Sequence, residues 1–147
     1  MPMLSTQLEV IVYPDAGADW RSEITDAPTW PQIEVAVERL DRAEYPILHL
    51  YLPRPERESD LWMLNVIGGR GEYGMSGMDG RWHERWRFRD PARPCGPELI
   101  DIWVTDQGAS FAATYLCDDL SVVLRACQHF AESGRLDGGM AWELKPA

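Results

Sequence analysis

The sequence has little cysteine and no long apolar run. Its only cysteines are Cys95, Cys117 and Cys127, an odd number without a CxxC pair, so we expect no disulfide framework and a reducing compartment. No apolar stretch approaches the roughly 18 residues that a membrane helix needs. The first residues lack the basic and apolar regions of a secretory signal. These features predict a cytoplasmic protein that does not enter a membrane.

Lysine is nearly absent, and acidic residues dominate the charge. Lys145 is the only lysine among 14 basic residues, against 24 acidic ones, which gives a net charge of −10. A field of this sign repels nucleic acid and anionic lipid and accelerates encounter with a basic partner. Solubility alone would also explain the charge. One segment, 81–93, runs against the trend because it contains Arg81, Arg85, Arg87, Arg89 and Arg93.

The 147 residues are enough for one domain with one hydrophobic core, and no linker or internal repeat divides them. We therefore predict a single domain over residues 1–147. Residues 14–28, rich in Pro, Gly and Asp, are expected to form a loop. Strand patterns occur at 6–13, 47–52, 61–67, 72–78, 81–88, 98–105, 109–117 and 140–145, and helices are expected near 30–43 and 119–133. The order β-α-β-β-β-β-β-β-α-β predicts an α+β fold with a mostly antiparallel sheet of six to eight strands.

Both helices have recognisable ends. Thr29 is a candidate N-cap of the first helix, either Asp118 or Asp119 is a candidate N-cap of the second, and Gly134 is a candidate left-handed C-cap. The apolar residues recur at helical spacing and predict two buried stripes. The residues expected to be buried are Ile33, Val37, Leu40, Val123, Leu124, Cys127 and Phe130.

Two motifs resemble ligand sites without meeting their chemical requirements. Residues 69–74 match GxGxxG, but a dinucleotide site needs a helix after the glycines, and the following residues are poor helix formers. A tight turn is expected there. His83-Glu84 and Pro94-Cys95 resemble part of a zinc deaminase signature, but the spacing differs and the second cysteine is missing.

No cysteine–histidine pair meets the requirements of a catalytic nucleophile and its base either. Cys127 lies on an apolar helix stripe, where burial would make its thiol inert, while His129 lies off that stripe. The acidic positions lack the spacing of a calcium loop. We therefore predict a protein that is not an enzyme, with no catalytic residue, no cofactor and no metal.

Several segments together resemble a known family. They are TWPQIEVAVERLD, LNVIGGRGEYGM, IDIWVTDQG, YLCDDLSVVLRACQHFAESGRL and AWEL. The order and spacing of IGG, DQG, FAESG and WE over about residues 30–145 resemble the immunity protein 1 family, found beside bacterial polymorphic and contact-delivered toxins. The resemblance implies a small cytoplasmic α+β protein that binds a cognate toxin domain and blocks its active site. Nucleic-acid deaminases are frequent cognates in that family, alongside other toxin enzymes.

A toxin of this kind would be basic, so contacts are expected from acidic and aromatic groups on turns. The candidate partner-binding residues are Asp106, Gln107, Asp118, Asp119, Glu72 and Tyr73. Capping and turn formation would explain the aspartates equally well. The loop with Trp20 and Trp30 is the next candidate.

The rival hypothesis is a small enzyme or ligand-binding domain with a pocket between sheet and helices. The sequence does not decide the oligomeric state.

Overall fold

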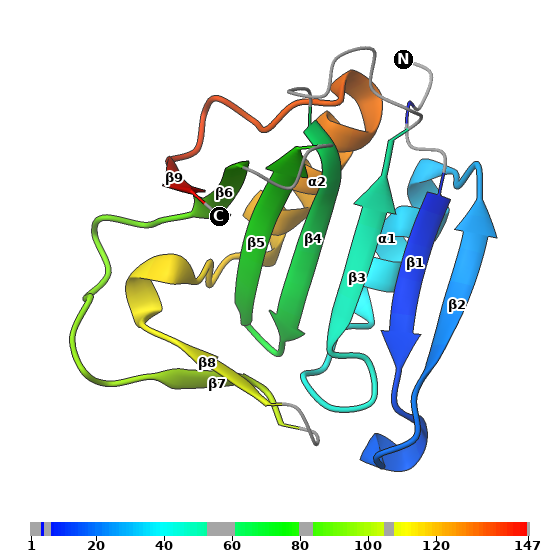
Figure 1. Ribbon diagram of the computed structural model, residues 1–147, viewed down its shortest axis with the longest axis horizontal. Coiled ribbons are helices and arrows are strands. Elements are labelled where there is room, and N and C mark those ends of the chain that lie inside the picture. Colours follow the sequence, from blue (N-terminus) through cyan, green and yellow to red (C-terminus); the bar gives the residue numbers. More distant parts are fainter. Residues whose placement is uncertain (1–3, 5–6, 53–60, 80–83, 105–107, 147) are drawn as a thin grey trace.

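The computed structural model describes residues 4, 7–52, 61–79, 84–104 and 108–146. Figure 1 shows one large twisted sheet with two helices behind it and a small two-stranded ribbon at its lower left. In spatial order the sheet consists of β2 (Arg21–Asp26), β1 (Gln7–Val12), β3 (Ile47–Tyr51), β4 (Leu61–Gly69), β5 (Glu72–Asp79), β6 (Glu84–Phe88) and β9 (Trp142–Pro146). The ribbon pairs β7 (Ile100–Trp103) with β8 (Ala109–Phe111).

All neighbouring strands of the seven-stranded sheet are antiparallel. The sheet is built from hairpin neighbours except where β1 pairs with β3 and where β6 pairs with the C-terminal β9. The prediction of an α+β fold with a mostly antiparallel sheet of six to eight strands is confirmed.

The helix ends lie where the capping residues predict them. In α1 (Trp30–Glu38), the Thr29 hydroxyl accepts from the Gln32 backbone N–H, and the Gln32 side chain accepts from the Thr29 N–H. This reciprocal arrangement satisfies two donors that the first turn would leave free. In α2 (Leu120–Ser133), Asp119 caps the start and Gly134, at φ 73°, caps the end in the left-handed conformation.

Both helices pack on the same face of the sheet and bury one apolar stripe each. Strand residues that point toward the helices, such as Leu48, Leu64 and Val66, are fully buried between the two layers. Six of the seven helix residues expected in the core are buried, whereas Leu124 is only partly buried and packs against the edge of the core.

Three boundaries differ from the sequence prediction. Residues 21–26, expected to be loop, form β2, which pairs with β1. α1 ends at Glu38 because the Asp41 carboxylate accepts from the N–H groups of Ala43 and Tyr45 and closes a turn. The expected strand 109–117 stops at Phe111, and a 3₁₀ turn over Ala113–Tyr115 replaces its second half.

The glycine-rich turn joins β4 to β5 as a hairpin, as expected for residues 69–74, and no helix follows it. Gly69 has φ +136°, and a Cβ at this position would lie 2.4 Å from the Leu40 carbonyl oxygen. Gly71 has φ +87° but would meet nothing within 4 Å. Gly69 is therefore required both for its conformation and for the close approach of the Leu40 backbone.

We expect Gly69→Ala to lower the free energy of unfolding by roughly 3 kcal/mol or more, because strain and a backbone clash add. Gly71→Ala, which meets only the conformational penalty, should cost about 1 kcal/mol. Urea denaturation of the two variants measures both values. Equal costs would contradict the close approach of Leu40 to Gly69.

Candidate functional site

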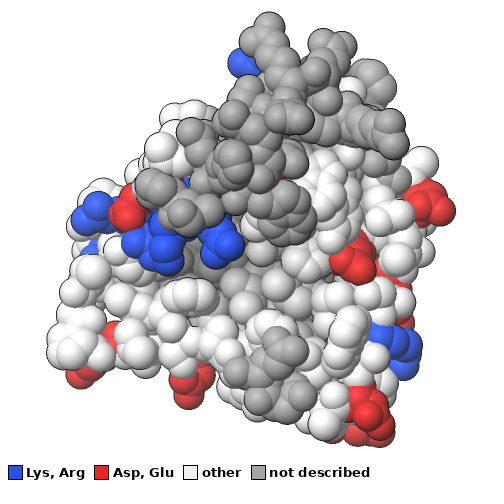
Figure 2. Space-filling view, in the orientation of Figure 1, with Lys and Arg blue, Asp and Glu red and all other residues white. Residues whose placement is uncertain are grey.

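Neither described helix covers the second face of the sheet, which we call the open face. Figures 1 and 2 show this face toward the viewer. Antiparallel pairing places His49, Asn65, Ser76 and Arg87 in one row across β3 to β6 on this face. The β7–β8 ribbon packs near one end of it, where Ile102 approaches Gly74. The open face therefore has a row of polar side chains from four neighbouring strands.

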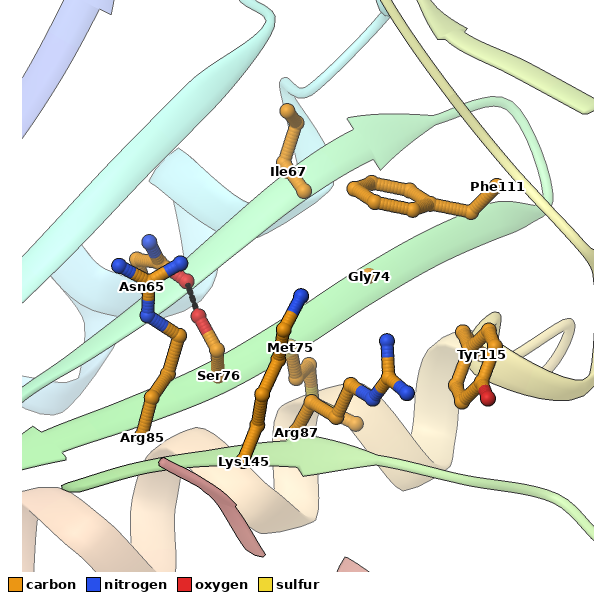
Figure 3. Close-up of a pocket in the computed structure, with 10 residues that line it drawn as sticks. All are labelled: Asn65, Ile67, Gly74, Met75, Ser76, Arg85, Arg87, Phe111, Tyr115 and Lys145. Atoms are coloured by element: carbon orange, nitrogen blue, oxygen red, sulfur yellow. Dashed lines mark hydrogen bonds between the residues drawn. The ribbon is translucent and has the colours of Figure 1, made fainter. Parts of the chain in front are cut away.

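A pocket of about 110 Å³ lies on this face between the sheet and the segment after β8 (Figure 3). Basic side chains from β6 and β9 form one side, and two aromatic rings form another. The residues that line it are Asn65, Ile67, Gly74, Met75, Ser76, Arg85, Arg87, Phe111, Tyr115 and Lys145. The Ser76 hydroxyl hydrogen-bonds the Asn65 side chain in its wall.

Arg87 is held in place by two contacts. Its Nη2 donates to Glu143 Oε1 at 2.7 Å, and its guanidinium stacks on the Tyr115 ring at 3.7 Å from the centroid. The hydrogen bond from Arg87 lowers the pKa of Glu143. The Arg87 Nε is buried and has no hydrogen-bond partner among the described residues. The guanidinium is thus fixed in position while its buried Nε–H donor is unused.

Arg85 and Lys145 lie opposite each other in the β6–β9 pairing. Within the described part of the chain, neither forms an ion pair or a side-chain hydrogen bond. Figure 2 shows basic side chains gathered on this side of a strongly acidic protein. Alternation along the strand puts Arg85 and Arg87 on one face of β6, but nothing in the sequence placed Lys145 beside them.

The predicted partner-binding residues have different environments. Asp106 and Gln107 lie outside the described residues. Asp118 and Asp119 are exposed, and the Asp119 carboxylate accepts from the Ser121 N–H and hydroxyl. The Ser121 side-chain hydrogen bond is the main cause that lowers the pKa of Asp119.

Glu72 and Tyr73 are less available than expected. Glu72 forms a two-pronged ion pair with Arg93, with both Nη–Oε distances at 2.8 Å. Tyr73 is only 4% exposed, because its ring belongs to the core between sheet and helices. The structure therefore corrects the expectation for Tyr73: its side chain lies in the core and does not face a partner.

The backbone brings two of the predicted turns together. Tyr73 and Cys117 exchange N–H···O hydrogen bonds of 2.9 and 2.7 Å, which places Asp118 near the start of β5. Arg93 lies between them, and its pKa is raised mainly by the hydrogen bond to Glu72 and further by Asp118 and Asp90. Asp118 is thus the exposed acid of this cluster that neither caps a helix nor pairs with Arg93.

The cysteines are placed as packing residues. Cys117 and Cys127 are buried, and burial raises the pKa of Cys127 to about 12. Desolvation also lowers the pKa of His49. Its cross-strand neighbours are Glu9 and Asn65, so neither residue paired with it is a cysteine. His83 lies outside the described residues. Among the residues that the structure describes, no three His, Cys, Asp or Glu side chains are grouped to hold a metal ion.

We expect a thiol reagent such as DTNB to label only Cys95 in the native protein at neutral pH. The raised pKa of Cys127 keeps its thiol protonated until the pH approaches about 12, so almost no thiolate is present at pH 7. Denatured protein should release three equivalents of thionitrobenzoate, and native protein one. Rapid labelling of Cys127 in the folded protein would contradict its burial.

Comparisons with known proteins add information about the fold. No family model and no curated protein matches the chain. A solved structure described as a hypothetical protein from Neisseria gonorrhoeae is similar over 96% of both chains, with a TM-score of 0.60 and 12% identity. At this identity the likeness shows a shared fold alone. Among the described helices, neither α1 nor α2 has the length and apolar character of a membrane span.

Proposed function

We propose that this chain is an immunity protein that binds a cognate bacterial toxin domain and blocks its active site. The observation that carries the proposal is the ordered set of IGG, DQG, FAESG and WE segments over about residues 30–145, which resembles the immunity protein 1 family. The fold is of the α+β kind that this resemblance implies. The open sheet face and the exposed acidic turn at Asp118 offer surface for a protein partner.

The charge supports a basic, nucleic-acid-directed toxin as the partner. A groove that holds phosphates is positively charged, and a protein with a net charge of −10 is attracted to it over long range. Attraction of this kind mainly raises the association rate, which suits an inhibitor that must act before the toxin does. The protein itself performs no reaction under this proposal.

The test is to mix the purified protein with the toxin domain encoded beside its gene. We expect a complex in size-exclusion chromatography and loss of the toxin's enzymatic activity at equimolar protein. The association rate should fall on the order of tenfold between about 50 mM and about 500 mM salt, because exposed charges become screened. Absence of both complex and inhibition would refute the proposal.

Asp118→Lys tests whether the acidic turn contributes to this rate. A several-fold slower association is expected, and Asp118→Asn, which removes the charge without reversing it, should have a smaller effect. Asp119 is unsuitable for this purpose because it caps α2. An unchanged rate in folded Asp118→Lys protein would place the contact on another surface.

The basic pocket supports a second candidate function, binding of a small organic acid. Arg85 and Lys145 lack anionic partners among the described residues, and Arg87 is already oriented by Glu143. Ile67 and Phe111 add apolar walls. The volume of about 110 Å³ is somewhat smaller than the ~150 Å³ cavity known to hold benzene, so only a carboxylate on a short body would fit.

Thermal unfolding with glutarate tests this candidate. At tenfold above its dissociation constant, a ligand that binds only the native state stabilises it by about 1.4 kcal/mol. We expect this shift with glutarate and not with neutral glutaramide. The shift should disappear in the Arg85→Gln/Lys145→Gln variant, which removes both charges and keeps polar side chains at both positions. Equal stabilisation of the variant would exclude the pocket as the site.

A further inference from the structure

β2 is an edge strand whose outer side is open. It pairs with β1 on one side, and none of the described residues pairs with it on the other. Its side chains alternate between exposed and half-buried, and Ile24 is 54% exposed at its centre. An exposed edge with an apolar side chain can recruit another strand, and natural proteins usually protect such edges.

A groove of about 470 Å³ runs beside this edge, between β2 and α1. Its walls include Thr25 of β2 and Pro31 and Val35 of α1, and its floor includes Leu8 and Val10. Val35 is 59% exposed although it lies on the helix that covers the sheet. A strand added to β2 would place every second side chain over this groove, because side chains alternate between faces.

The opposite face of the same edge is also apolar. Ile24 stands opposite Glu9 in the β1–β2 pairing and therefore lies on the open face of the sheet. Trp20, just before the strand, is 56% exposed. An added strand would meet apolar side chains on both faces, Ile24 on one and Val35 on the other.

The charges around β2 indicate which kind of strand would bind to this edge. Exposed carboxylates flank β2 in the chain, with Asp15 and Asp19 before it and Asp26 at its end. The nearby Arg21 and Arg39 both form ion pairs with Glu23, at 3.3 and 3.2 Å. A second copy of this chain would bring like charges together, which costs free energy. A basic strand would be attracted.

We propose that β2 is the docking edge for the toxin, which adds an extended, positively charged segment with alternating apolar residues to the sheet. This inference rests on the proposed immunity function and specifies its interface. Main-chain hydrogen bonds to β2 would supply affinity, and the groove beside Val35 would supply selectivity for the inserted side chains. The edge lies on different elements from Asp118, so variants at the two surfaces report separately.

Hydrogen exchange in the toxin complex tests strand addition directly. Along an edge strand, alternate N–H groups point away from the sheet and exchange readily. We expect exchange within residues 21–26 to slow by at least about tenfold on binding. A complex that leaves this exchange unchanged overturns the docking edge and leaves the immunity function standing. Failure to form any complex overturns both.

Two substitutions test the apolar contacts. Ile24→Lys places a long charged side chain on the edge strand and Val35→Lys places one beside the groove, and each should weaken binding about tenfold or more. Leu99→Lys is the matched control, since Leu99 is 61% exposed and lies before β7, and it should change the dissociation constant less than about twofold. Thermal unfolding checks that the variants are folded. Equal weakening by all three would mean that charge alone matters and would overturn the docking edge.

Discussion

The backbone and side chain of Arg42 hold together the lower end of the sheet, and the position of the open face depends on this junction. Its guanidinium donates to the carbonyl oxygens of Gly69, Arg70 and Asp101 at 2.7, 3.0 and 3.2 Å. Its own N–H donates to Gly68, and its carbonyl accepts from Val104. One residue thereby connects the α1–β3 turn, the β4–β5 hairpin and the β7 strand.

This junction explains why position 69 is a glycine and why the β7–β8 ribbon lies where it does. The chain after α1 can approach Gly69 closely only because that residue has no side chain. Arg42 itself adopts φ 71°, which costs about 1–2 kcal/mol for an L-residue and is offset by its carbonyl contacts. With β7 tied to the hairpin, the β7–β8 ribbon lies near one end of the open face and its continuation supplies Tyr115 to the pocket.

The parts of the fold that local chemistry determines were predictable, and those that depend on distant contacts were not. Thr29 begins α1 through its own side chain and Gly134 ends α2 through its backbone freedom, so the local sequence located both, whereas Asp119 was one of two candidate caps, with Asp118, for the start of α2. β2 was missed because an edge strand with exposed residues lacks the apolar alternation by which strands are recognised. The strand expected over 109–117 ends early because the Thr114 carbonyl accepts from the Asp90 N–H and the Thr114 N–H donates to the Pro94 carbonyl, and both partners are far away in sequence.

The candidate sites depend on the pairing of distant strands even more strongly than the element boundaries do. Arg85 and Arg87 were recognised as one face of a strand, but Lys145 and Glu143 reach them only through the β6–β9 register. That pairing joins residues almost sixty positions apart, and no local pattern encodes it. The groove beside β2 likewise exists only because α1 covers β1 and stops short of the edge.

Several residues in the segments that carry the family resemblance perform structural tasks in this chain. Gly69 permits a backbone contact, Gly134 ends α2, Trp142 packs on Phe88 and donates to the Asp137 carbonyl, and Glu143 orients Arg87. Residues with such tasks cannot also be altered to fit a particular toxin without loss of stability. Under the proposed function, recognition would use side chains whose replacement leaves the core intact, such as the exposed Ile24 on β2 and Val35 beside it.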